Sequence, residues 1–362
     1  MKNKIINITL NTLLAFIVFA DINKINAQMI ASNYRRYEEI KTQAGKPFII
    51  ERTDGINLRF IPLVNKLVAL GWDESWVREK FADNSTVFIP KLALTSFNKS
   101  KVLKENNSYS WMYTEESDSI CKNFIEKYSK SLLNAERIYG VNPEVISALL
   151  WCETRHGKVT GDYPILSSFA SMAMMSHPTC LLKSIKNTNQ YLDSIGVDSI
   201  ERHEVINKIR ERSITKSNWA FEEIKALLTI EKNGSIDILQ LKSSWAGAFG
   251  WAQFLPSSYL KFSSDGNGDK KVNLFNPSDA IFSVANYLNR SGYIEGNMVA
   301  VRRALRNYNR SYDYSNAIAN LAERILPIKD DNSTPDSSSQ VINNHPAVTG
   351  NKTSQQPITI PE

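Results

Sequence analysis

The 362-residue chain has the composition of a folded globular protein, with 42% hydrophobic and 22% charged residues, enough apolar material for one large core or two smaller ones. Lys and Arg exceed Asp and Glu by 43 to 37, and this formal charge of +6 suits an anionic polymer and an anionic lipid equally, so charge alone identifies no partner. The three cysteines, Cys121, Cys152 and Cys180, are too few for a disulfide scaffold and allow one bridge at most.

The first 27 residues are typical of a secretory signal peptide. Lys2 and Lys4 form a short basic region, residues 13–20 (LLAFIVFA) form an apolar core, and Ala27 offers a small residue for cleavage before Gln28. The apolar run is shorter than the ~20 residues that a membrane-spanning helix needs, and no cysteine stands directly after it for lipid attachment. We therefore expect an exported, periplasmic protein that is not integral to a membrane after cleavage.

Helical periods dominate the chain after residue 57 and strand signals are weak, so the predicted fold class is mainly α. Residues 58–70 carry an apolar stripe that Gly71 ends, and Asp73 can cap a second helix that continues to Phe81. Residues 84–116 are rich in Asn and Ser and are predicted to form loops.

A long helix is predicted over residues 118–139, closed by Gly140. The next helix, 144–156, begins with a cap at Asn142 and a first-turn proline at Pro143. Further helices are predicted over 166–175, 219–232, 278–290, 298–306 and 315–326.

The predicted elements divide the chain into segments of different character. Residues 179–217 are polar and charged and look like an insertion, and residues 244–276 are rich in Gly, Ser and Asp and predict a loop site. The last stretch has too few apolar residues to fold and is predicted to be disordered. The predicted segments are a signal peptide (1–27), an N-terminal helical lobe (28–116), a second helical domain (117–326) and a tail (327–362).

Glu153 stands on an apolar face of its predicted helix. Ile146, Leu149 and Leu150 precede it by seven, four and three residues, so the four side chains share one face. Burial of a carboxyl group disfavours its ionised form and raises its pKa, as a general acid near neutral pH requires. The alternative is a structural carboxylate paired with Arg155 or with a backbone donor.

Three sequence blocks stand in a fixed order: ALLWCETRHGKVTGDYPILSSFASMA, then SSWAGAFGWAQFLPSSYLKFSSDGNGDKKVNLFNPSDAIFSVANYL, then NYNRSYDY. In content, order and spacing, these blocks resemble the B-type lytic murein transglycosylases of the lysozyme-like superfamily, over roughly residues 58–325. The resemblance implies a lysozyme-like transglycosylase fold with a helical N-terminal lobe and little β structure. It also implies that the substrate is the glycan strand of peptidoglycan.

The resemblance also implies roles for single residues. It assigns the catalytic acid/base to Glu153, in the Glu-Thr pair of the first block. The residues that it implies along the sugar groove are Ser244, Gln253, Tyr308, Asn309 and Tyr314. Trp251 and Tyr259 are further candidates for stacking under sugar rings, with core packing as the alternative.

The chemistry that the resemblance implies needs one carboxyl group, whereas most glycosidases use two. Glu153 would protonate the oxygen of the bond between muramic acid and glucosamine. The 2-acetamido oxygen of the sugar would meet the positive charge at the anomeric carbon. Glu153 would then take the proton of the 6-hydroxyl, which closes a 1,6-anhydro ring without consuming water. No cofactor is required for these steps.

The loop DGNGDKKVNLFNPSD resembles a calcium-binding loop. Its candidate ligands for a structural calcium ion are Asp265, Asn267, Asp269, Lys271 through its carbonyl, and Asp279. The loop departs from the EF-hand pattern because Lys270 replaces the usual Gly and Asn276 stands where a closing Glu is expected. The alternative is a solvated turn.

Two other kinds of site receive less support from the sequence. Cys152 and His156, together with His177 and Cys180, have spacings that could form a tetrahedral zinc site. A Ser-His-Asp hydrolase is disfavoured because the chain has only four histidines and no Gly-x-Ser-x-Gly elbow. No nucleic-acid-binding motif accompanies the basic charge, so nucleic acid is not an expected partner.

Two alternative functions stay open. One is a lysozyme-type hydrolase on the same fold, in which Asp162 positions water, and the other is a noncatalytic peptidoglycan-binding protein. The sequence departs from familiar family members in the length of its 179–217 segment and in having His156 where an aromatic residue is common.

Overall fold

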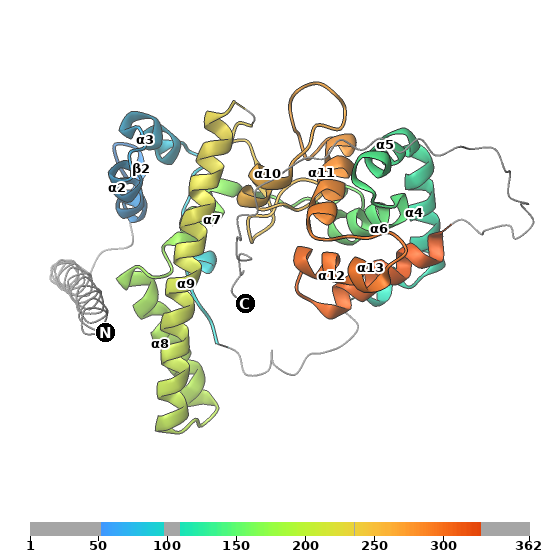
Figure 1. Cartoon of the computed structure of the whole chain (residues 1–362). Coiled ribbons are helices and arrows are strands. Elements are labelled where there is room, and N and C mark those ends of the chain that lie inside the picture. Colours follow the sequence, from blue (N-terminus) through green and yellow to red (C-terminus); the bar gives the residue numbers. More distant parts are fainter. Residues whose placement is uncertain (1–51, 98–108, 235, 327–362) are drawn as a thin grey trace, which may run out of the picture. The chain divides into compact units, whose positions relative to one another are not determined.

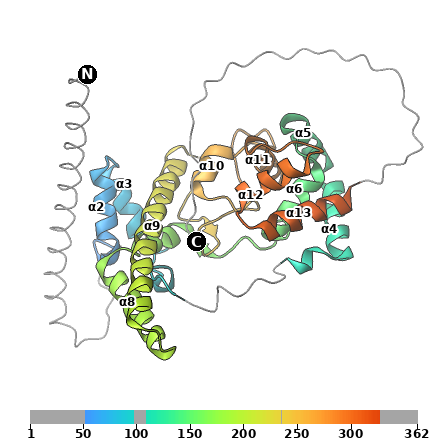
Figure 2. The ribbon, with the colours of Figure 1, turned by 60° about the horizontal axis from the view of Figure 1, so that its bottom comes forward.

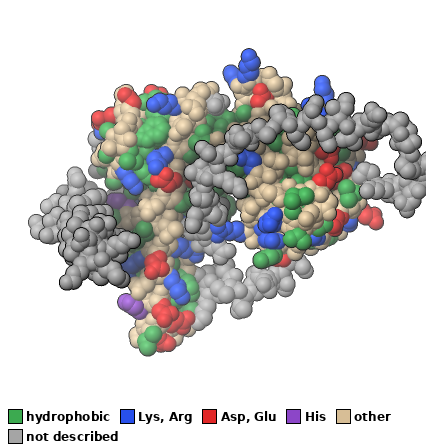
Figure 3. Space-filling model, viewed as in Figure 1, with side chains coloured by type: hydrophobic (Ala, Val, Ile, Leu, Met, Phe, Trp, Pro, Cys, Tyr) green, Lys and Arg blue, Asp and Glu red, His purple; other side chains and the backbone are tan. Residues whose placement is uncertain are grey.

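The computed structural model describes residues 52–97, 109–234 and 236–326, and most of them are helical (Figure 1). Strands in this part of the chain are limited to two antiparallel pairs of two residues each. The mainly α fold class is therefore confirmed. The signal peptide over 1–27 and the tail over 327–362 lie outside the described residues. On the face in Figure 3, charged side chains of both signs are spread among small groups of apolar ones.

The chain divides into two compact units, each assembled from separate stretches of sequence. The first combines the described part of Met1–Phe97 with Ala170–Asn218, and the second combines the described part of Asn98–Phe169 with Trp219–Glu362. The predicted domains at 28–116 and 117–326 are contiguous and remain a prediction.

The first unit begins with a short hairpin, β1 (Arg52–Thr53) and β2 (Ile56–Asn57). Asp54 and Gly55 make its turn with φ of 52° and 78°, the left-handed conformation that two-residue hairpin turns favour. After a single turn at Leu58–Phe60 come α2 (Ile61–Ala69) and α3 (Glu74–Ala82), where the helices were predicted. The carboxylate of Asp73 accepts from the Trp76 N–H at 2.8 Å, which confirms the predicted cap.

Two long helices replace the polar insertion expected at 179–217. These are α8 (Pro178–Ser194) and α9 (Ser199–Lys232), which lie side by side in Figures 1 and 2. Their polar residues are partly internal: the Thr95 and Ser213 hydroxyls are 2.7 Å apart, and the Ser184 hydroxyl accepts from the Thr95 N–H. Paired hydroxyls stabilise a packed helix although they look hydrophilic in sequence.

The second unit holds the other helices. Their bounds are α4 (Glu115–Lys127), α5 (Ser129–Tyr139), α6 (Pro143–Thr154), α10 (Pro256–Phe262), α11 (Pro277–Arg290), α12 (Met298–Tyr308) and α13 (Tyr312–Ile325). Helix α7 (Ile165–Ala173) and helix α9 both cross the boundary between the units, and β3 (Tyr163–Pro164) pairs with β4 (Lys242–Ser243).

The single helix predicted over 118–139 is wrong, because the chain breaks at Tyr128 between α4 and α5. Tyr128 leaves the helical conformation, with φ of −112° and ψ of 23°, and its ring packs on Phe124 and against Trp251. Tertiary packing of this aromatic side chain therefore overrides the local helical pattern.

Helix α6 is the centre of the second unit. Every residue from Pro143 to Trp151 is buried, and α13, α4, α5 and α11 pack around the helix (Figures 1 and 2). It ends two residues before the predicted His156, because Arg155 takes the left-handed conformation with φ of 54°. A helix buried on all sides holds its side chains in fixed positions.

Among the described residues, no single helix has the length and apolarity to cross a membrane. Helices α7 and α8 pass that test only as a pair, bent by 77° at their junction.

Candidate active site

Glu153 occupies the last turn of α6. Ile146, Leu149 and Leu150 on its face are fully buried, as the period predicted. Burial raises the pKa of the Glu153 carboxyl from its ordinary 4.5 to about 7, while a hydrogen bond from Tyr314 acts in the opposite direction. The side chain nevertheless keeps part of its surface exposed to solvent. A carboxyl group with this pKa exchanges a proton near neutral pH.

Tyr314, the third residue of α13, donates from its hydroxyl to Glu153 Oε1 at 2.5 Å. Its ring is 2% exposed, so this contact is fixed by packing. Arg155, the partner in the structural alternative, instead places its guanidinium over the Trp111 ring and 4.8 Å from the centre of the Trp151 ring. Glu153 makes no ion pair with any described residue, so the carboxyl is not neutralised in place.

The rings of two more tyrosines, Tyr308 and Tyr109, pack against the ring of Tyr314. The Tyr308 ring stacks on Tyr314 at 6.5 Å and 13°, and the Tyr109 ring meets it edge-on at 6.0 Å. Burial, then the nearby Cys152 and Glu153, raise the pKa of Tyr109 to about 12, so its phenol stays neutral. Tyr109 was missed by the sequence analysis because it lies in a segment with no motif.

A loop from residue 244 to 254 lies against the end of α6. The Thr154 hydroxyl donates to the Trp251 carbonyl at 3.0 Å, and the Tyr308 hydroxyl donates to the Ala252 carbonyl. Gln253 has φ of 48°, and its side-chain amide donates to the carbonyls of Gly250 and Thr160. Gln253 and Tyr308 thus hold the loop in place beside the helix that carries Glu153.

Ser244 and Asn309 are held in local turns. The Ser244 hydroxyl accepts from the Ala248 N–H at 3.2 Å, and the exposed Asn309 accepts from the Ser311 N–H at 3.1 Å. Neither side chain hydrogen-bonds Glu153. The structure therefore joins Tyr314 to Glu153 by a hydrogen bond and Tyr308 to Tyr314 by ring stacking. The roles of all six residues in catalysis or sugar binding stay predictions.

Tyr259 and Trp251, the two candidates for stacking under sugar rings, differ in their exposure. Tyr259 is 4% exposed and its hydroxyl donates to the Val272 carbonyl at 2.7 Å, so core packing accounts for this residue. Trp251 is partly exposed, and its ring packs against Phe124 and Tyr128.

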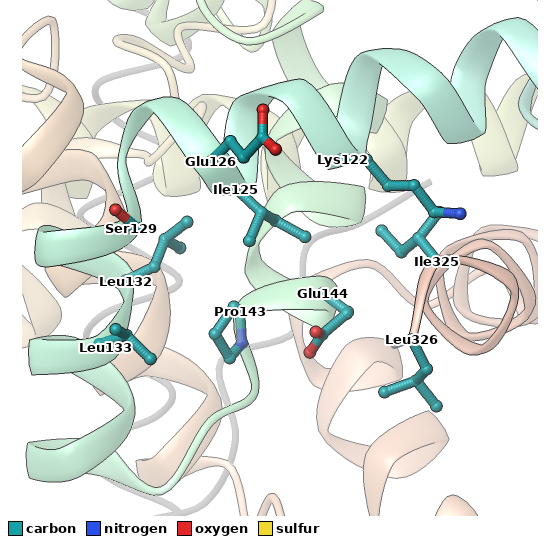
Figure 4. A pocket seen from close by; sticks show the side chains of 10 residues that line it. All are labelled: Lys122, Ile125, Glu126, Ser129, Leu132, Leu133, Pro143, Glu144, Ile325 and Leu326. Atoms are coloured by element: carbon teal, nitrogen blue, oxygen red, sulfur yellow. The ribbon is translucent and has the colours of Figure 1, made fainter. Parts of the chain in front are cut away.

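Two other buried carboxylates of this unit differ from Glu153. Glu223 is clamped, since its two oxygens accept from the Ser257 N–H and hydroxyl at 2.9 and 2.7 Å. Glu144 lines a groove of about 620 Å³ between α4, α5 and the ends of α6 and α13 (Figure 4). This groove lies at the other end of α6 from Glu153, about 14 Å away along the helix axis. Tyrosines do not line it, and its nearest charged groups are Lys122 and Glu126.

The candidate calcium loop is folded by its own acidic side chains. Asp265 accepts from the N–H groups of Asn267, Gly268 and Lys270, and Asp279 accepts from those of Gly266 and Asn273. Lys271 donates its N–H to Asp269. Throughout the described ranges, no three His, Cys, Asp or Glu side chains are grouped as metal ligands. The loop as folded is therefore not a ready-made metal site.

The zinc alternative receives no support. His156 stacks on Phe124 at 3.9 Å, and its Nε2 lies 2.9 Å from the Ser147 carbonyl, to which it donates when neutral. Burial lowers the pKa of His156 to about 4, so the ring is neutral at pH 7. All three cysteines are free thiols, and no disulfide forms.

A substitution at Gly157 tests how tightly the loop at 244–254 packs against the end of α6. A Cβ at Gly157 would lie 2.0 Å from the Trp251 ring, and φ is 83°, so Gly157→Ala is expected to cost roughly 3 kcal/mol of unfolding free energy or more. Gly140→Ala is the matched control, because Gly140 has φ of 64° but nothing within 4 Å of such a Cβ, and it should cost only about 1 kcal/mol. Urea unfolding of both variants measures the difference, and equal losses would contradict the packing.

The described fold and site define a class: a mainly helical, lysozyme-like domain with a carboxyl group that forms no ion pair at the end of its buried central helix. The model of the family described as "Transglycosylase SLT domain" matches residues 62–305, and the chain belongs to this family. The match runs from Pro62 in α2 to Leu305 in α12.

Individual relatives agree with this assignment. The membrane-bound lytic murein transglycosylase B of Escherichia coli is 32% identical over 178 residues, which are 49% of this chain and 39% of that protein. The chain thus spans well under half of that relative's length. Two solved structures share the fold. The E. coli lytic transglycosylase SLT35, in complex with bulgecin A, is 20% identical with a TM-score of 0.54 over 74% of this chain and 92% of its own. SltB3 of Pseudomonas aeruginosa, in complex with NAG-anhNAM-pentapeptide, is 16% identical with a TM-score of 0.53 over 73% and 78%.

Proposed function

We propose that the chain is a lytic transglycosylase that cleaves the MurNAc–GlcNAc bond of peptidoglycan and forms 1,6-anhydro-MurNAc, with Glu153 as its sole acid/base. The observation that carries the proposal is the Glu153 carboxyl, whose pKa is raised to about 7 and which accepts a hydrogen bond from Tyr314. The two E. coli proteins, which are named as lytic transglycosylases, support the reaction class.

The first step uses Glu153 as an acid. Because the Tyr314 hydroxyl donates to Oε1, the acidic proton sits on Oε2. Oε2 gives this proton to the glycosidic oxygen as its bond to the anomeric carbon breaks, and GlcNAc leaves with a new 4-hydroxyl. The 2-acetamido oxygen of MurNAc bonds to the anomeric carbon and takes up the developing positive charge.

The second step uses the same group as a base. The Glu153 carboxylate removes the proton of the 6-hydroxyl, O6 displaces the acetamido oxygen at the anomeric carbon, and the anhydro ring closes. Glu153 is protonated again and no water enters. Ser244 and Asn309 orient the acetamido and 6-hydroxyl groups, and Gln253, Tyr308 and Tyr314 line the sugar site. Such positioning contributes several orders of magnitude in rate.

Digestion of purified peptidoglycan, followed by mass spectrometry of the soluble fragments, tests the proposal. Anhydro ends are expected, each lighter by one water than a reducing end. Reducing ends would instead identify a lysozyme-type hydrolase. Sacculi that bind the protein but stay undigested would identify a noncatalytic wall-binding protein.

We also propose a structural calcium ion in the loop of Asp265, Asn267, Asp269, Lys271 and Asp279. Lys270 has φ of 68°, the left-handed conformation that the sixth position of an EF-hand loop requires. SLT35 of E. coli has been solved in complex with calcium. The ion would replace backbone donors now bound to the acidic side chains, and it takes no part in the reaction.

Calcium at 1 mM is therefore expected to raise Tm by roughly 2–4 °C, whereas magnesium at the same concentration leaves it nearly unchanged. Asp269→Asn, at an exposed ligand, should abolish the gain. A scanning calorimetry trace identical with and without calcium would refute the site.

The proposed cellular setting is the periplasm, reached through the signal peptide at 1–27. Peptidoglycan glycan strands are the proposed partner.

A further inference from the structure

A basic cluster lies along α12 and in the turn that leads to α13. Residues 298–313 contain four arginines and one acidic residue, Asp313, which gives the segment a formal charge of +3. The arginines are Arg302, Arg303, Arg306 and Arg310, and we call them the arginine cluster. Figure 3 shows Lys and Arg side chains on the surface over α12.

The arginine cluster is not neutralised by the protein. Arg302 donates to the side-chain oxygens of Asn316 and Asn320, which carry no charge. Arg306 lies with its guanidinium carbon 4.9 Å above the centre of the Tyr312 ring, which is 69% exposed. None of the four forms an ion pair with a described carboxylate. Arg306 follows Arg302 and Arg303 by four and three residues on α12, and like charges at these spacings destabilise a helix, an effect that an anionic ligand would offset.

The cluster is next to the proposed sugar site. Tyr308 bonds the Ala252 carbonyl and Tyr314 bonds Glu153, so both ends of the turn are tied to the site. Arg310 is two residues from Tyr308 and four from Tyr314, and is exposed. Four residues of extended chain span at most about 14 Å. A peptide stem on the sugar beside Glu153 extends over a comparable length, so its carboxylates can approach this side chain.

The chemistry of the substrate identifies the anion. The N-acetyl sugars of a glycan strand carry no charge apart from the muramic acid lactyl group, and that group is amide-bonded to a peptide when a stem is present. The carboxylates are then those of the peptide stem. An Arg fork recognises a carboxylate through two parallel N–H donors, and a guanidinium held flat on an aromatic ring keeps its donor edges free.

We propose that Arg306 and Arg310 bind carboxylates of the peptide stem and make stem-bearing glycan the preferred substrate. This inference rests on the proposed function, since it concerns the same site. It predicts weaker binding and a higher KM for stem-bearing glycan when both charges are removed, with kcat nearly unchanged.

The test compares stem-bearing glycan strands, freed of crosslinks by an endopeptidase, with strands from which an amidase has removed the stems and whose exposed lactyl carboxylates are capped as methylamides. Arg306→Gln/Arg310→Gln should raise KM on the stem-bearing strands by about tenfold, flatten its salt dependence, and leave KM on the capped strands within about twofold. Arg306→Lys/Arg310→Lys should recover part of the affinity because the charge remains. Arg137→Gln, at an exposed arginine of α5, is the matched control and should behave as the wild type.

Equilibrium binding of fluorescently labelled strands in a Glu153→Gln background measures binding without turnover, and circular dichroism checks that each variant is folded. Equal losses on the stem-bearing and the capped strands, or no loss on either, would overturn the inference. If the wild-type protein releases no anhydro fragments, the proposed function itself fails. That result is distinct from arginine variants that digest both substrates like the wild type.

Discussion

Glu153→Gln is expected to lower the rate of anhydro-muropeptide release by about a thousandfold or more, because one group serves both proton transfers. Gln has the shape of Glu and can still accept the Tyr314 hydrogen bond, but it has no proton to give. Glu144→Gln is the matched control: it lies on the same helix, is also buried, and has a pKa raised first by burial. The control should keep wild-type activity.

Glu153→Gln should also increase the stability of the folded protein. The pKa of Glu153 rises from 4.5 in a free carboxyl to about 7 in the folded protein, so ionisation favours the unfolded chain. The free-energy cost of keeping Glu153 ionised in the folded protein is absent below pH 4.5, grows between pH 4.5 and 7, and is constant above that range. Glu153→Gln should therefore be more stable than the wild type by roughly 1–3 kcal/mol at pH 8 and equal to it at pH 4.

Urea unfolding at both pH values measures this gain. A variant that is inactive but no more stable at pH 8 would show that the carboxyl is not destabilised by burial. A Glu153→Gln protein that still releases fragments at more than a tenth of the wild-type rate would remove Glu153 from the mechanism.

Tyr314→Phe has the second largest expected effect, a fall in kcat of roughly 10- to 100-fold. The hydroxyl fixes Oε1 and stabilises the carboxylate form of Glu153, which the second step requires. Its removal raises the pKa of Glu153 further, because burial then acts without the opposing hydrogen bond. Wild-type activity should decline as the pH rises above about 7, and in Tyr314→Phe this decline should move to higher pH.

The pH profile separates this role from a structural one. Tyr293→Phe is the control, since Tyr293 donates to the Asn142 side chain at 2.5 Å at the far end of α6. It loses a comparable hydrogen bond and should leave the profile unchanged. An alkaline limb at the same pH in Tyr314→Phe and the wild type would contradict the coupling to Glu153.

Much of the second unit was predictable from local sequence. The period of Ile146, Leu149 and Leu150 placed Glu153 on a buried face, because a helix repeats its faces every 3.6 residues whatever surrounds it. In the first unit, the cap at Asp73 likewise follows from side-chain chemistry within one turn. Such features depend on neighbours in the chain and need no knowledge of the tertiary structure.

The features that were missed depend on contacts between distant segments. The break at Tyr128 follows from packing on Trp251, and the helices at 179–217 bury hydroxyl pairs such as Thr95 and Ser213 that no pattern reveals. Tyr109 joins the site through the Tyr314 ring, although its own segment has no motif. Family resemblance placed Tyr314 along the sugar groove, and the structure adds its hydrogen bond to Glu153.

The central claim is that Glu153 cuts the strand by internal ring closure, and digestion in water labelled with heavy oxygen tests it most directly. The account predicts soluble fragments whose muramic acid ends contain no label, and none of these fragments from Glu153→Gln. Label at the anomeric carbon of the released ends would mean that water attacks that carbon, and the account would be wrong.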